Sequence, residues 1–133
     1  SYAATVFGLV RRLSRKQSGW ISDWEIIVAD VAKKMYAGVP GTTDTLLYTT
    51  VAAGGIVRSI HVANTTGTAA TLTLGLNAGA ALAAANHFLS AVSIPANATY
   101  DWSGFQVLDG SGTIRGLQGT ASALTVTISG VEL

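Results

Sequence analysis

Few side chains in this sequence could take part in catalysis, and they form no recognisable catalytic motif. There are two histidines, His61 in Ser-Ile-His-Val and His87 in Asn-His-Phe, and there is no cysteine. An imidazole can act as a base only beside a nucleophile and an orienting carboxylate, and no Gly-x-Ser-x-Gly elbow supplies the nucleophile. The absence of cysteine excludes disulfides, thiolate nucleophiles and thiolate metal ligands. The sequence therefore predicts that the protein is not an enzyme, with both histidines on strand faces or interfaces.

The patterns that bind metals, nucleotides or other cofactors are also incomplete. Two distant histidines and scattered acidic residues give no zinc-ligand spacing. The run from Asp109 to Thr113 resembles the start of a calcium loop, but the later acidic ligands and the bidentate glutamate are missing. Gly54-Gly55 lacks the spacing and the lysine of a phosphate-binding loop. We expect no cofactor and no metal, and a hairpin turn at 109–113.

The main electrostatic feature is a basic cluster near the start of the sequence. Up to Lys34 there are six basic and three acidic residues, and after it two basic and four acidic, although the net charge is only +1. Two tryptophans follow the cluster, and exposed tryptophan is enriched at protein interfaces because it buries much area. We therefore expect this segment to dock on a protein, with a solvated arm and nucleic-acid contact as the alternatives. The predicted partner-binding residues are Arg11, Arg12, Arg15, Lys16, Trp20 and Trp24.

The overall composition predicts a protein whose surface partly faces other protein. Charged residues make up 11% of the chain and hydrophobic residues 49%, and so few charges cover a free surface poorly. No apolar run reaches the roughly 18 residues of a membrane span. Residues 1–10 carry no basic segment ahead of an apolar one, which is the wrong order for a signal peptide. We expect a complete chain made in the cytoplasm, with no membrane partner.

The sequence changes character near Gly38-Val39-Pro40-Gly41, a turn pattern that we take as the boundary between an arm and a body. The arm is residues 1–40 and the body is residues 41–133. Within the arm, Ser22 and Glu25 form a capping box, and apolar residues then recur at helical spacing. The pattern predicts a helix over 23–36. The alternative is a strand through 25–28, because β-branched residues dominate there.

The body alternates apolar and polar residues, which is typical of half-buried strands. Its turn patterns separate seven or eight short strands, which predicts an all-β antiparallel sandwich related to the jelly roll. Tyr100 and Trp102 alternate with polar residues and are expected in the core rather than on a sugar-binding surface. The Ala-rich stretch 78–85 could be a helical turn or a loop. The expected strands are 45–51, 56–64, 71–76, 89–94, 99–102, 105–108, 113–117 and 124–129.

The body also resembles a family of small virion proteins from tailed bacteriophages. The resemblance is carried by Gly41–Val51, Val57–Gly67, Leu89–Asn97 and Leu124–Gly130, and covers about two thirds of the chain. These segments are strand and turn patterns, and the arm does not share them. The resemblance implies a β-sandwich fold and a place in the virion.

Proteins of this family serve as capsid decoration, or cement, proteins and as tail- or fibre-associated modules, often as trimers. The resemblance therefore implies a homotrimer that binds the major capsid protein or another virion protein, after assembly in the host cytoplasm. An arm on a β-sandwich is similar to a cement protein, whose arm clamps neighbouring capsid subunits. The alternative within the family is a fibre module that binds a host receptor or glycan.

Overall fold

Two antiparallel four-stranded sheets make up the larger of two structural units. The computed structural model describes residues 14–16, 19–21 and 31–133. The larger unit is Ala32–Glu132, and the smaller consists of Ser1–Val31 with Leu133. In the smaller unit, β1 (Ser14–Lys16) and β2 (Gly19–Ile21) form an antiparallel hairpin. The prediction of an all-β chain with two antiparallel sheets is thus confirmed for the larger unit.

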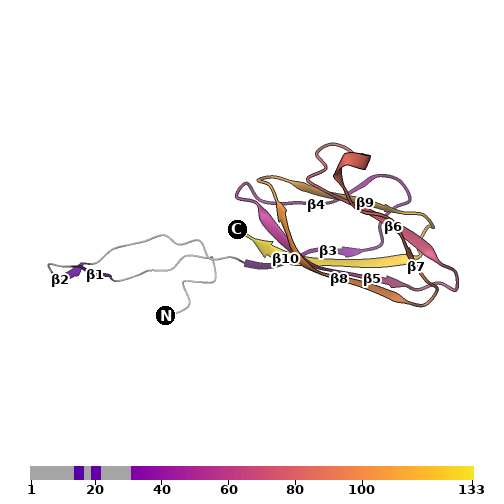
Figure 1. Ribbon diagram of the computed structural model, residues 1–133, viewed down its shortest axis with the longest axis horizontal. Helices are drawn as coiled ribbons and strands as arrows, with labels where there is room; N and C mark the ends of the chain where they lie inside the picture. The colour runs from indigo at the N-terminus through magenta and orange to yellow at the C-terminus, as the bar shows by residue number, and fades with distance from the viewer. Residues whose placement is uncertain (1–13, 17–18, 22–30) are drawn as a thin grey trace. The chain divides into compact units, whose positions relative to one another are not determined.

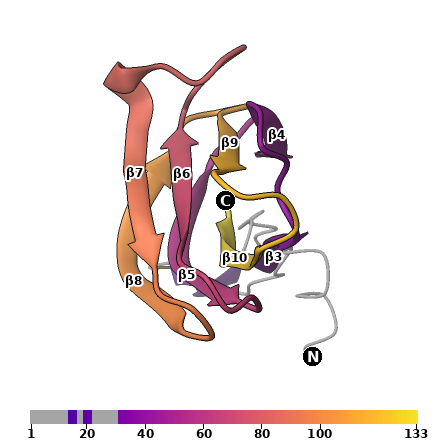
Figure 2. The same cartoon turned by 90° about the vertical axis from the view of Figure 1, so that its right-hand side faces the viewer.

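The two sheets lie face to face in a sandwich-like arrangement (Figures 1 and 2). One has the strand order β3-β10-β5-β8 and the other β4-β9-β6-β7. The first sheet contains β3 (Val31–Gly38), β10 (Leu124–Glu132), β5 (Gly55–Asn64) and β8 (Thr99–Leu108). The second contains β4 (Thr45–Thr49), β9 (Thr113–Gln118), β6 (Ala70–Leu76) and β7 (His87–Ile94).

The pairing of these eight strands is nested. The innermost pair is the β6–β7 hairpin, followed outward along the chain by β5 with β8, β4 with β9, and β3 with β10. Two further ladders, β6 with β9 and β10 with β5, join these pairs into the two sheets. The larger unit is therefore a long antiparallel ribbon rolled so that alternate pairs fall in opposite sheets.

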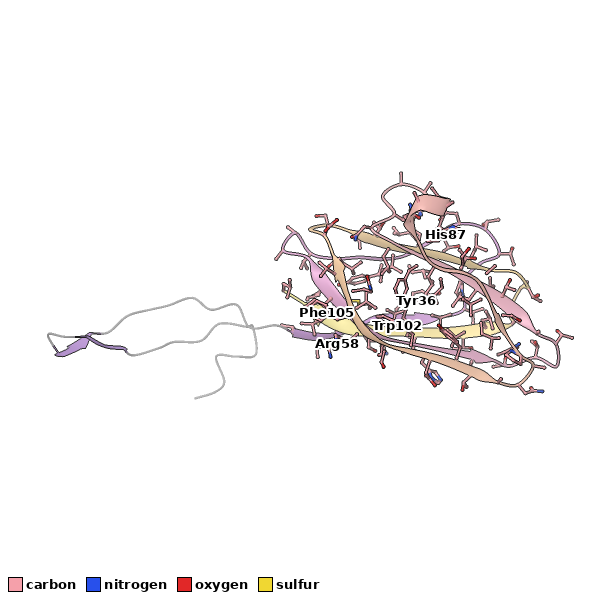
Figure 3. All side chains as sticks on the ribbon, viewed as in Figure 1. Tyr36, Arg58, His87, Trp102 and Phe105 are labelled. Carbon is pink, nitrogen blue, oxygen red and sulfur yellow. The ribbon has the colours of Figure 1, made fainter. Side chains whose placement is uncertain are left out.

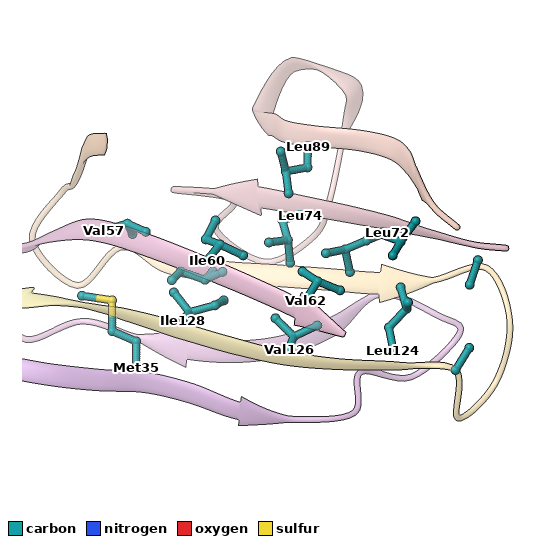
Figure 4. Packing of buried hydrophobic residues seen from close by; sticks show 14 of the residues in the cluster. Met35, Val57, Ile60, Val62, Leu72, Leu74, Leu89, Leu124, Val126 and Ile128 are labelled. Atoms are coloured by element: carbon teal, nitrogen blue, oxygen red, sulfur yellow. The ribbon is translucent and has the colours of Figure 1, made fainter. Parts of the chain in front are cut away.

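The core lies between the sheets because apolar residues at every second position point inward. Leu72 and Leu74 of β6 face Ile60 of β5 and its neighbours (Figure 4). Burying each such side chain contributes about 1.5–3 kcal/mol. The largest fully buried apolar residues are Val57, Ile60, Val62, Leu72, Leu74, Ile94, Leu108, Ile114, Leu124, Val126 and Ile128.

Strand β8 is continuous where the sequence predicted two strands, at 99–102 and 105–108. Gly104, between the two expected segments, lies beneath the Trp102 ring, where a Cβ would lie 2.8 Å from ring carbon Cζ2. Tyr100 and Trp102 pack against the core as expected, each half-buried. Trp102 also meets Phe88 of the other sheet edge-on, with 4.8 Å between ring centroids.

The segment 31–36, which we expected to end a helix, is the edge strand β3. Met35 is buried in the core against Gly55 and Gly130. The compact unit therefore starts at Ala32, and the boundary expected at Pro40 lies too late in the chain. The helical spacing was misleading because sheet pairing with β10 overrides a weak local pattern. Residues 23–30 of the predicted helix, and the alternative strand 25–28, lie outside the described residues.

Gln118 holds together two loops at one end of the sandwich. Its side chain is fully buried, and its Oε1 accepts hydrogen bonds from the backbone N–H groups of Ala123 (3.1 Å) and Leu124 (2.8 Å). Its Nε2 donates to the carbonyl of Pro40, and its backbone N–H donates to Gly41. One side chain thus fixes both the loop after β3 and the turn before β10.

The undecided Ala-rich stretch is a loop that ends in a 3-10 turn, η2 (Ala84–Asn86). Asp44 anchors it by accepting a hydrogen bond from the backbone N–H of Leu82 at 2.9 Å. The same carboxylate accepts one from Arg115 Nε at 2.8 Å. These two bonds, the guanidinium's first, lower the pKa of Asp44. The loop is therefore attached to the second sheet through Asp44, which directly precedes β4, and Asp44 is in turn bonded to Arg115 of β9.

Replacing Ala91 by glycine is expected to stabilise the protein by about 0.5–1 kcal/mol. Ala91 lies at a bulge in edge strand β7 with φ +47°, a left-handed conformation that strains any side chain with a Cβ. Its N–H still donates to Thr73 Oγ1, a bond that glycine keeps. Urea unfolding measures the change. The matched control is Ala63→Gly in β5, which should lose stability instead, and equal losses at both positions would contradict the strain argument.

Candidate functional site

The only His–Asp contact in the described ranges lies on the outer face of the first sheet. His61 of β5 pairs in register with Thr127 of β10 on one side and Asp101 of β8 on the other. His61 Nδ1 forms a hydrogen bond with Asp101 Oδ1, and because a carboxylate only accepts, Nδ1 carries the proton in this contact. The three side chains across the strands, from Thr127 to His61 to Asp101, therefore form a row of hydroxyl, imidazole and carboxylate. This is the order of groups in a hydrolytic triad.

The surroundings of this row lack what a hydrolytic site needs. The side chains of His61 and Asp101 are 51% and 68% exposed, so water surrounds both groups and screens their charges. An oxyanion needs free backbone N–H donors, but β5 is an inner strand whose ladder pairs on both sides. His87 is also exposed, 3.3 Å from the hydroxyl of Ser90. The row is better understood as a polar surface contact.

The described residues also form neither a metal-ligand cluster nor a membrane-spanning helix. There, no group of three or more histidine, aspartate or glutamate side chains could hold a metal ion. In the same part of the chain, no helix has the length and apolar character that crossing a membrane requires. The most distinctive features left are therefore the surfaces of the sheets and the N-terminal hairpin.

The structure places half of the predicted partner-binding residues on the N-terminal hairpin. Arg15 and Trp20 are directly opposite each other in the β1–β2 register, and Lys16 lies opposite Gly19. The other predicted residues, Arg11, Arg12 and Trp24, lie outside the described residues. The register brings one basic and one aromatic position of the cluster together, which the sequence alone did not predict.

The outer face of strands β10, β5 and β8 has two different halves. In the polar half, three rows of side chains run across the strands. Nearly all the side chains that surround the His61–Asp101 contact there carry a hydroxyl group. The other half is apolar, because Ile56 pairs with Val131 on one side and Val107 on the other. The polar rows are Thr125–Ala63–Thr99, Thr127–His61–Asp101 and Ser129–Ser59–Ser103.

We call Ile56, Phe105, Val107 and Val131 the apolar patch. Phe105 and Val107 are 58% and 51% exposed, while Ile56 and Val131 are partly covered. Arg58 lies over the Phe105 ring, 5.9 Å from its centroid, in a cation–π contact (Figure 3). A bulge at Arg58 and Ser59 puts both of these neighbours on the outer face, between the polar half and the patch.

Sequence reasoning missed the apolar patch. The alternation in β5, β8 and β10 predicted strands, but the patch exists only because two registers, β10 with β5 and β5 with β8, align Val131, Ile56 and Val107. The one sequence signal was that Phe105 and Val107 share the phase of Thr99, Asp101 and Ser103, the polar face of β8. Large apolar residues at positions that otherwise face solvent indicate a surface that another molecule covers.

A polar contact between the sheets predicts a measurable tyrosine titration. Tyr48 of β4 donates a hydrogen bond to Glu132 of β10, and burial together with this bond raises the pKa of Tyr48 to about 12. We expect one tyrosine to titrate near that value in alkaline difference absorbance. Because the folded-state pKa lies above the ordinary 10.0, this stabilisation is complete below pH 10 and is lost as the pH rises toward 12.

The control for this titration is Tyr48→Phe, which should remove the late step and leave the other tyrosine steps unchanged. Tyr36 must be followed separately, because burial also raises its pKa. A Tyr48→Phe variant that keeps the step near pH 12 would show that another tyrosine is responsible.

In the described strands, the outer face of the first sheet offers a polar half and an apolar patch for contact with other molecules. The chain matches no protein-family model, no curated protein sequence and no solved structure.

Proposed function

We propose that this chain is a structural protein of a tailed-phage virion, a cement protein that binds the capsid through an N-terminal arm and a β-body, and that it is not an enzyme. The observation that carries the proposal is the division of the chain. The compact unit Ala32–Glu132 is separate from an N-terminal unit that holds the whole basic and tryptophan-containing cluster. Two separate contact regions on one chain suit a clamp between neighbouring subunits.

The strand order supports a jelly-roll assignment for the body. If β3 to β10 are taken as eight successive strands, nested pairing in two sheets is the arrangement of a ribbon folded into two Greek keys. Jelly rolls are common in viral capsid domains, and also in lectins and cupins, so the fold alone gives no function. Together with the charge-poor surface and the separate arm, it favours a virion role.

The physical advantage of such a clamp is avidity. If the body binds one capsid subunit and the arm another, the second contact forms at the high effective concentration set by the connecting chain. Two modest contacts then give one strong attachment. A trimer would multiply the effect further, and we propose a homotrimer with the major capsid protein as partner.

The arm is tested by charge reversal in the full-length protein. Arg15→Glu/Lys16→Glu should weaken binding to purified particles of the parent phage by about tenfold or more, because interface charges set association and pairing. The matched control is Lys33→Glu/Lys34→Glu, which makes the same charge change on exposed residues of β3. Equal weakening in both variants would mean that only overall charge matters, which would contradict arm docking.

An electron-microscopy map of the particle tests the location. Density for the β-unit on the capsid surface would support the cement assignment. Density on the tail or a fibre would instead favour a module that binds a host receptor or glycan. Absence of the chain from purified particles would overturn the virion assignment.

A further inference from the structure

The apolar patch is an exposed surface beside the polar half of the face that the described strands β10, β5 and β8 form. Its four side chains come from three adjacent strands, and Phe105 and Val107 are more than half exposed. Adjacent strands are about 4.8 Å apart, so these side chains form one continuous surface. Arg58 is the charged neighbour that the structure places on it, through the Phe105 ring. Apolar surface with an aromatic and an arginine is typical of the centre of a protein interface.

At Val107, beside the patch, a side chain already occupies the edge of β8, where an added strand would pair. Asn77 Nδ2 donates to the carbonyl of Val107 at 3.2 Å, and Asn77 Oδ1 accepts from the N–H of Asp109 at 2.9 Å. An added strand would need these same backbone groups. With the Val107 carbonyl occupied, a partner at the patch is better placed across the face of the sheet, against the side chains.

The sequence itself contains a segment suited to this face. Residues 1–10 carry no charged side chain and include Val6, Phe7, Leu9 and Val10. An apolar segment of this kind needs a surface to cover it, as the patch does. The four basic residues of the predicted cluster begin only at Arg11, so the segment can bind the patch while the cluster remains available for the capsid.

The arm is long enough to reach the patch of another molecule. An extended chain spans about 3.3 Å per residue, so the thirty residues before β3 can reach roughly 100 Å. The patch of the same chain is also within reach, since crossing the sheet that contains β3 takes about 15 Å at the usual strand spacing. The choice of a second copy therefore follows from the proposed homo-oligomer. We propose that residues 6–10 of one copy cover the apolar patch of a second copy. This inference rests on the proposed function, because it identifies the contact that would join the homo-oligomer.

Disulfide cross-linking between full-length chains tests the contact, since the sequence has no cysteine of its own. One tagged variant carries Gly8→Cys, which keeps the four apolar side chains of the segment, and a differently tagged variant carries Val107→Cys. We expect the mixture to form a cross-linked heterodimer about tenfold more efficiently than a mixture with Thr125→Cys. Thr125 is the matched control because it is exposed on the polar half of the same face.

Sedimentation of patch variants provides a second measurement. Phe105→Asp and Val107→Asp should shift the protein to monomers while keeping the thermal transition of the body, because both side chains are largely exposed. The inference is overturned if cross-linking is equal at Thr125→Cys, if both patch variants keep the oligomer, or if the cross-link forms within single chains of a Gly8→Cys/Val107→Cys double variant. Particle binding by Arg15→Glu/Lys16→Glu tests the proposed function separately, because those residues lie outside both the patch and the segment.

Discussion

A chain that begins at Gly41 is expected to be unfolded or aggregated, whereas a chain that begins at Val31 is expected to fold cooperatively. The first deletion removes β3 and with it Met35, whose side chain fills the space beside Gly55 and Gly130. It also removes the Pro40 carbonyl that accepts the hydrogen bond of the buried Gln118. Losing the methionine alone costs about 2–5 kcal/mol, and exposing the edge of β10 adds to this. Domains of this size have a total stability of only about 5–15 kcal/mol.

Circular dichroism with urea unfolding measures both truncations. Met35→Ala in the full-length chain is the intermediate case and should lose about 2–5 kcal/mol while remaining folded. Lys34→Ala is its matched control, because that neighbouring side chain is exposed on the same strand, and it should change stability by less than about 0.5 kcal/mol. If the chain that begins at Gly41 unfolds with the same midpoint as the longer one, β3 is not part of the cooperative unit.

Gln118→Ala is expected to destabilise the protein by about 3–5 kcal/mol. The substitution leaves the buried N–H groups of Ala123 and Leu124 and the carbonyl of Pro40 without their partners. Each unsatisfied buried group costs about 1–3 kcal/mol, and the missing side-chain volume leaves a cavity as well.

Gln118→Met separates the two contributions, because methionine fills much of the volume but makes none of the three hydrogen bonds. It should therefore recover only the cavity part of the loss. Gln106→Ala on exposed β8 is the matched control and should change stability by less than about 0.5 kcal/mol. A loss below about 1 kcal/mol in Gln118→Ala would mean that water replaces the glutamine, contrary to the burial of its side chain.

The strands with clear period-two alternation were predicted from the sequence, whereas β3, which has one buried residue, was not. The segments 71–76 and 124–129 alternate over six residues, and they are β6 and the first part of β10. In β3, Met35 is the only buried residue and its neighbour Tyr36 is partly buried, so no alternation marks the strand. Lys33 and Lys34 on an exposed edge strand are a common protection against edge pairing, but in the sequence they looked like the end of a helix.

Contacts that depend on register could not be read from the sequence at all. Alternation tells which residues share a face of one strand, but not which strand is the neighbour or how the two are aligned. The His61–Asp101 contact and the apolar patch both arise from the β5–β8 register. The role of Gln118 was hidden for a related reason, since its three partners come from two loops distant in the sequence.

The nested pairing of the strands also affects how the protein is made. A ribosome releases the chain from its first residue, yet the outermost pair joins β3, at the start of the compact unit, to β10, at its end. The first sheet therefore cannot close until nearly all of the unit has left the ribosome, and such long-range pairing folds slowly. During that interval, the segment before β3 has already left the ribosome, ahead of most of the compact unit. Oligomers built through the arm would then form most readily between chains made together on one messenger RNA.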